Sequence, residues 1–132
     1  MILKKTLAAL LSEEEDENED IFDLVDQLVA EYGEEDLAQR LYRDIPQDYP
    51  WDLIAELYDI LIWSTNDNGT ALIKTTQQWL LEGDDIRKIQ IALNLGVYPF
   101  KERSKMVEVL SKLAIQYPAI ASRCQEWINK RR

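Results

Sequence analysis

Apolar residues recur three and four positions apart along almost the whole chain of 132 residues, and no stretch shows the sustained alternation of a strand. The first clear stripe comprises Ile21, Leu24, Val25, Leu28, Val29 and Tyr32. Gly33 follows this stripe at the position where helices commonly end in a left-handed turn. The pattern predicts an all-α protein of seven or eight helices.

Glycine and proline divide the next part of the chain. A second helix begins after the acidic residues 34–36 and is stopped by Pro46. Pro50 suits a helix start and opens a third helix that runs to Trp63. Because this third helix is apolar on more than one face near its end, we expect it to be centrally packed and Trp63 to be largely buried.

The same order of elements then returns. A helix over about residues 70–82 ends at Gly83, a second begins at "DDI" and ends at Gly96, and "VYPF" opens a long third helix in which Leu110 should be buried. Pro118 closes this helix or begins the last one, over residues 118–132. The motifs 49–51 and 98–100, both Tyr-Pro-aromatic, align at an offset of 49.

This recurrence predicts two related three-helix units, residues 20–64 and 70–117, in a single domain of residues 1–132. Residues 1–19, an N-terminal helix with an acidic linker, and the C-terminal helix would cap the ends. Pro50 and Pro99 would stand at equivalent helix starts, with an adjacent aromatic packed over the junction. The alternative is that the two Tyr-Pro motifs are exposed aromatic binding loops.

A period of this length with three helices per unit resembles the armadillo and HEAT class of helical repeats. The resemblance covers residues 20–117 and rests on the order of helices, glycines and prolines described above. It implies a short stacked array whose units bury their faces against their neighbours. It also implies a scaffold that binds another protein.

Charge is distributed unevenly along the chain, whose formal net charge is -10. Residues 1–68 hold 19 acidic and 4 basic side chains, and residues 69–132 hold 6 and 11, so the halves carry about -15 and +5. The first half would repel nucleic acid and the second supplies only a thin basic surface, so a protein with a basic surface is the expected partner. The two halves could instead attract each other, within one molecule or between two in a homodimer.

The acidic run from Glu13 to Asp20 is the most conspicuous polar segment. It is either a solvated linker that caps the helix after it or a docking surface for a basic partner. The spacing of a calcium loop fails here, because Ile21 and Gln27 stand where that loop needs glycine and glutamate, so we predict no metal site. Candidate partner-binding acids are Glu13, Glu14, Glu15, Asp16, Glu17, Glu34 and Glu35.

Candidate contacts also include two aromatic residues and three bases. Tyr49 and Tyr98 could supply apolar anchors if they are exposed. Lys101, Arg103 and Lys105 fall in the first two turns of their expected helix, where the helix dipole disfavours cations. An acidic partner, a phosphate group, the chain's own acidic half or an ordinary solvated face would account for them.

Catalytic chemistry has few candidates in this sequence. The chain contains no histidine, and its one cysteine, Cys124, lies on an apolar stripe where an inert buried thiol is expected. No apolar run approaches the roughly 20 residues of a membrane span. We therefore expect a cytoplasmic protein that has no cofactor or membrane contact. We expect it to serve as a non-enzymatic interaction module or adaptor.

Two other functions remain open at this point. One is an acidic immunity or antitoxin type of inhibitor that neutralises a basic toxin or nuclease. The other is an enzyme that uses carboxylates alone.

Overall fold

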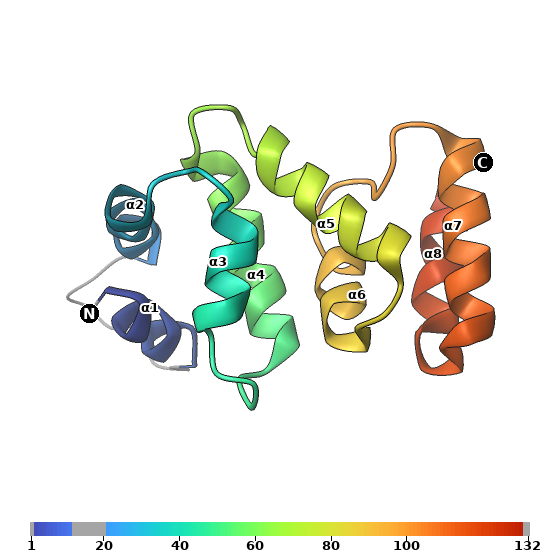
Figure 1. Ribbon diagram of the computed structural model, residues 1–132, viewed down its shortest axis with the longest axis horizontal. Coiled ribbons are helices and arrows are strands. Elements are labelled where there is room, and N and C mark those ends of the chain that lie inside the picture. Colours follow the sequence, from blue (N-terminus) through green and yellow to red (C-terminus); the bar gives the residue numbers. More distant parts are fainter. Residues whose placement is uncertain (1, 12–20, 131–132) are drawn as a thin grey trace. The chain divides into compact units, whose positions relative to one another are not determined.

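The computed structural model describes residues 2–11 and 21–130, and every regular element in that part of the chain is helical. The all-α prediction is confirmed, because no strand occurs among the described residues and the predicted number of α-helices is found. The elements, labelled in Figure 1, are α1 (Ile2–Leu11), α2 (Ile21–Tyr32), α3 (Leu37–Asp44), α4 (Trp51–Ser64), α5 (Thr70–Glu82), α6 (Ile86–Leu93), α7 (Arg103–Gln116), a 3-10 turn η1 (Pro118–Ile120) and α8 (Ala121–Lys130).

The chain divides into two compact units, Met1–Leu72 and Ile73–Arg132. Residues 69–72 carry no charged side chain, so this division coincides with the change in charge along the sequence. The first unit therefore carries the net charge of about -15 and the second that of about +5.

The core of the first unit is built on α4. Its inward residues follow helical spacing, and α1 and α2 both pack against this helix. Two buried tyrosine hydroxyls join further elements to the core: Tyr58 donates to the carbonyl oxygen of Ala38 in α3, and Tyr49 donates to that of Leu7 in α1, each at 2.6 Å. The buried residues of α4 are Ile54, Ala55, Leu57, Tyr58, Leu61 and Ile62.

The turn between α4 and α5 is fixed by Asp67 and Gly69. The Asp67 carboxylate accepts hydrogen bonds from the backbone N–H of Gly69 and of Ala71, both at 3.0 Å. These bonds, the one from Ala71 first, hold the pKa of Asp67 below its ordinary value. Gly69 has a φ of +78°, and a Cβ there would approach Ile62 to 2.9 Å, so the turn requires glycine.

The second unit has its own core, to which α5, α6, α7 and α8 all contribute. Burial raises the pKa of the Cys124 thiol, which lies in this core, to about 11. The tight packing agrees with the expectation that Leu110 would be buried. The core residues are Leu80, Ile89, Ala92, Leu93, Phe100, Met106, Leu110, Leu113, Ile120, Cys124 and Trp127.

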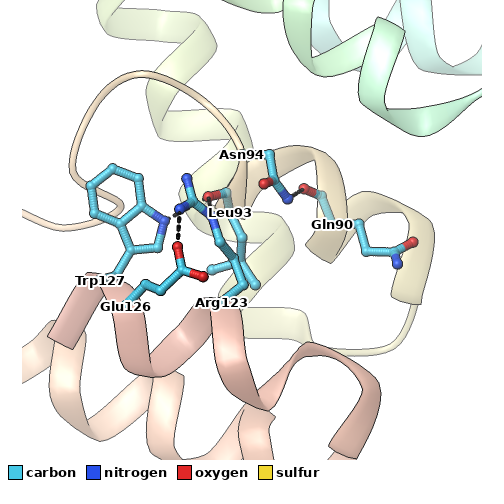
Figure 2. Close-up of polar contacts among 6 residues, drawn as sticks. All are labelled: Gln90, Leu93, Asn94, Arg123, Glu126 and Trp127. Atoms are coloured by element: carbon cyan, nitrogen blue, oxygen red, sulfur yellow. Dashed lines mark hydrogen bonds and ion pairs between the residues drawn. The ribbon is translucent and has the colours of Figure 1, made fainter. Parts of the chain in front are cut away.

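The end of α6 is closed by side chains of α8 (Figure 2). The carbonyl oxygen of Leu93 accepts from the indole Nε1 of Trp127 at 2.6 Å and from Nε of Arg123 at 3.1 Å. The guanidinium of Arg123 is also paired with Glu126 at 2.8 Å. A carbonyl that has no partner within its own helix is thus satisfied twice, by a cationic and a neutral donor.

The second Tyr-Pro motif does not start a helix, so the predicted equivalence of the two prolines is wrong. Pro50 immediately precedes α4, whereas α7 begins at Arg103, after an extended Glu102. Phe100 is buried in the core of the second unit, and two further residues follow it before the chain turns into α7. Lys101 consequently lies before the helix, and Arg103 and Lys105 lie in its first turn.

Candidate interaction surface

The outward face of α4 carries three acidic residues and a tryptophan in one stripe. Asp52, Glu56, Asp59 and Trp63 are separated by four, three and four positions, which places them along one line of the helix surface. Asp52 and Glu56 are exposed and Asp59 is half-buried. We call these four residues the α4 stripe.

Trp63 is 80 % exposed, so the expectation that it would be buried is wrong. It lies two positions beyond the buried Leu61, a rotation of about 200° around the helix, and therefore points away from the core. The spacing from Asp52, Glu56 and Asp59 was the sequence signal that could have assigned Trp63 to the polar face. Single exposed apolar side chains are common at protein surfaces, so Trp63 is a candidate contact because of its size and its place in line with the three acids.

The carboxylates of the α4 stripe act on neighbouring groups. Tyr49 has a pKa raised to about 12, first by burial and then by the negative charges of Glu56 and Asp52. Like charges four positions apart also destabilise a helix by roughly 0.2–0.5 kcal/mol. The stripe is thus a local concentration of negative charge in which only Asp52, in the first turn, is placed to favour the helix dipole of α4.

Trp63 differs from the two buried tryptophans in its surroundings. Lys88 lies 5.5 Å from the ring centre of Trp79, and Arg123 and Lys130 each lie 4.9 Å from that of Trp127. Within residues 2–11 and 21–130, no cation is placed over the Trp63 ring in this way. The ring is open to a cationic or apolar group from another molecule.

Two of the other predicted acidic contacts lie in the loop between α2 and α3. Glu34 is half-buried, and its Oε1 accepts from the backbone N–H of Asn66 at 2.8 Å, which joins two loops of the first unit. Glu35 is exposed, and its main-chain carbonyl accepts from Arg40 at 3.0 Å. The candidates Glu13, Glu14, Glu15, Asp16 and Glu17 lie outside the described residues.

The two candidate tyrosines have opposite environments. Tyr49 is buried with its hydroxyl bonded inside the first unit, so its proposed role as an exposed anchor is wrong. Tyr98 is 46 % exposed, and its ring lies against Trp127 at 5.3 Å in an edge-to-face arrangement. The first Tyr-Pro motif buries its tyrosine, while the second buries Phe100 and leaves its tyrosine at the surface.

Tyr98 borders a small hollow in the second unit, with a volume of about 400 Å³. Ile73 and Gln77 of α5 form one side, and Val97, Tyr98 and Lys101 of the loop before α7 form the other. We call these five residues the Tyr98 hollow. Its walls are mainly apolar, and Lys101 supplies a positive charge.

The three candidate bases are not gathered at one site. Lys101 lines the Tyr98 hollow, whereas Lys105 lines a separate groove of about 490 Å³ beside α5 and α7. Arg103 is exposed and borders neither of these hollows. The groove mixes acids with bases, including an ion pair between Lys112 and Glu108 at 3.5 Å, so it has no single charge preference.

In the described part of the chain, no group of three or more histidine, cysteine, aspartate or glutamate side chains is arranged to hold a metal ion. Nor is any described helix long and apolar enough to cross a membrane. Compared with protein-family models, curated proteins and solved structures, the chain matches none of them.

Proposed function

We propose that this chain is a non-enzymatic protein-interaction module whose acidic first unit binds a basic surface of another protein. The observation that carries the proposal is the α4 stripe, in which an indole that is 80 % exposed follows three carboxylates along one helix face. The exposed ring buries little surface within its own unit, and the neighbouring like charges repel one another. Both would become favourable against a basic surface with an apolar cleft.

The carboxylates and the indole have different effects on binding. Exposed ion pairs contribute little affinity individually, but the summed field of an acidic surface speeds encounter with a basic partner. A tryptophan buries roughly 150–250 Å² and is among the residues that most often dominate an interface. We therefore expect the acids to set the association rate and Trp63 to set the dissociation rate.

The armadillo-like or HEAT-like arrangement belongs to this proposal as the scaffold that presents the stripe. The order of helix, glycine, helix and Tyr-Pro motif in α2 to α4 returns in α5 to α7 and supports it. An acidic inhibitor of a basic toxin or nuclease is a second candidate, favoured by the net charge of about -15 on the first unit. In that case the partner would be a basic enzyme that loses activity when bound.

The proposal is tested by affinity capture from extracts of the native cells, followed by binding kinetics with the recovered partner. The double variant Asp52→Asn/Glu56→Gln should slow association at least about threefold in low salt and reduce its dependence on salt. The control, Glu102→Gln/Glu108→Gln, makes the same charge change in the second unit and should leave the rate unaltered. Equal rates for the two double variants would refute a role for the stripe.

Trp63 is tested separately through the dissociation rate. Trp63→Ala should raise this rate about thirtyfold or more if the indole is a central anchor. Phe22→Ala is the matched control, because Phe22 is also an aromatic residue at the surface of the first unit, 59 % exposed. The run outside the described residues is examined with Glu13→Gln/Glu14→Gln/Glu15→Gln/Glu17→Gln, which would slow association further if the run also faces the partner.

A further inference from the structure

The Tyr98 hollow has the composition of a binding site for one large apolar side chain beside a carboxylate. Ile73 and Val97 provide apolar walls, Tyr98 provides an aromatic wall, and Lys101 supplies a cation that can pair with an acid. A volume of about 400 Å³ has room for an indole.

The wall formed by Tyr98 is held in place from behind. Its ring lies against Trp127, which is fixed by the bond from its indole nitrogen to Leu93 and by Arg123 and Lys130 over its ring (Figure 2 shows the first of these cations). A wall that is already ordered loses little conformational freedom when a ligand arrives. The Tyr98 wall of the hollow is therefore preorganised before a ligand binds.

The chain itself carries a segment with the matching chemistry. In the α4 stripe Trp63 is the large apolar group, and Asp59 and Glu56 lie one and two turns before it. The stripe belongs to the unit with a net charge of about -15, and the hollow to the unit with about +5. The two features are complementary in charge and in polarity.

We propose that the Tyr98 hollow receives the α4 stripe of a second copy of this chain, with Trp63 of one copy inserted between Tyr98, Val97 and Ile73 of the other. This inference rests on the proposed function, because it identifies the basic surface that the stripe binds. Pairing the stripe with itself across a two-fold axis would set acids against acids. Each copy instead offers one stripe and one hollow, so the contact joins unlike surfaces and can be made reciprocally by two copies, join successive copies or close into a ring.

Self-association of the purified full chain is the primary measurement, by sedimentation velocity over roughly 10 µM to 1 mM, the range of a small interface. The wild type should show a mass that rises with concentration. Trp63→Ala and Lys101→Glu should each weaken association about thirtyfold or more. The matched controls Phe22→Ala and Lys112→Glu alter an exposed aromatic and an exposed lysine outside both features, and both should associate as the wild type does.

Mixing the two defective variants distinguishes this arrangement from a contact of stripe with stripe. Trp63→Ala retains an intact hollow, and Lys101→Glu retains an intact stripe, so an equimolar mixture should form a 1:1 heterodimer that grows no further. Each variant alone should stay monomeric at the same concentration. A mixture that remains monomeric would overturn the proposal, and so would self-association that survives Trp63→Ala.

The helical circular dichroism of each variant checks that it is folded. Tyr98→Ala is a second test of the hollow, because it removes one wall without changing the charge, and it should lose association as Lys101→Glu does. A wild type that stays monomeric at 1 mM, while capture of another protein still depends on Trp63, would reject the second copy and leave the proposed function standing. Self-association and capture of another protein that both persist in Trp63→Ala and in Asp52→Asn/Glu56→Gln would reject both.

Discussion

The indole Nε1 of Trp127 donates to the carbonyl oxygen of Leu93 across 2.6 Å, and both residues are buried in the second unit. The same oxygen accepts from Arg123, whose guanidinium also lies over the Trp127 ring. The end of α6 and the face of α8 are therefore joined through a single acceptor. Removing either donor leaves a buried carbonyl with one partner fewer.

Trp127→Phe should lower the free energy of unfolding by roughly 1–3 kcal/mol, because the phenyl ring keeps part of the packing and loses the donor. Trp63→Phe is the matched control: its ring is at the surface, and it should change stability by less than about 0.5 kcal/mol. Both values are obtained from urea unfolding followed by circular dichroism. Equal decreases in the free energy of unfolding for the two variants would contradict a structural role for Trp127 and a surface position for Trp63.

Two aliphatic residues of α7 provide a second contrast. Leu110 is fully buried, and Leu110→Ala should cost roughly 2–5 kcal/mol through lost burial and a residual cavity. Ile115, on the same helix, is 83 % exposed, and Ile115→Ala should stay within about 0.5 kcal/mol of the wild type. A large decrease in the urea midpoint of Ile115→Ala would show that this side chain is covered in solution.

Tyr49 makes stability depend on alkaline pH. Its pKa is raised from an ordinary value of 10 to about 12, so folding favours the protonated phenol. The contribution of the protonated Tyr49 to the free energy of unfolding is fully present below pH 10 and is lost as the pH rises from 10 to 12. Tyr49→Phe should be less stable at neutral pH by roughly 0.5–1.5 kcal/mol, through the lost bond to Leu7, and should show a shallower decline in that alkaline window. Denaturant unfolding at a series of pH values checks both expectations.

Cys124 should resist thiol reagents in the folded chain. Its pKa of about 11 leaves about one thiolate per thousand molecules at pH 8, and its side chain is buried. We expect labelling by an aromatic disulfide reagent, followed by absorbance, to be at least about a hundredfold slower than in the urea-unfolded chain. Fast labelling in buffer would mean that α8 opens readily.

Local signals in the sequence predicted most of the helices. Gly33 adopts the positive φ angle expected where its helix ends, Gly83 also has a positive φ at the predicted end of α5, and α5 has the predicted bounds. Asp85 caps α6 by accepting from the N–H groups of Arg87 and Lys88, in line with the acidic start read from "DDI". These features depend on a few neighbouring residues, which is why a single sequence is enough to place them.

The wrong predictions concern residues whose burial or helix position depends on contacts with residues distant in the sequence. The motifs at Tyr49 and Tyr98 look alike in sequence, but Tyr49 has the carbonyl of Leu7 as a partner, whereas Tyr98 lies at the surface against Trp127. Burial of Phe100 in its core separates Pro99 from the start of α7. The candidate site was missed for a related reason. Trp63 was predicted to be buried because it is hydrophobic, whereas its angular position around α4 places it on the polar face.

The exposure of Trp63 also gives the protein an internal optical probe. Of the four tryptophans, Trp79 and Trp127 are buried and Trp51 is half-buried, so water-soluble quenchers reach the Trp63 indole most readily. An indole in contact with water emits at longer wavelength than one in an apolar core. When a partner covers the α4 stripe, the quenchable, red-shifted part of the emission should move to shorter wavelength, so binding can be followed on the unlabelled chain.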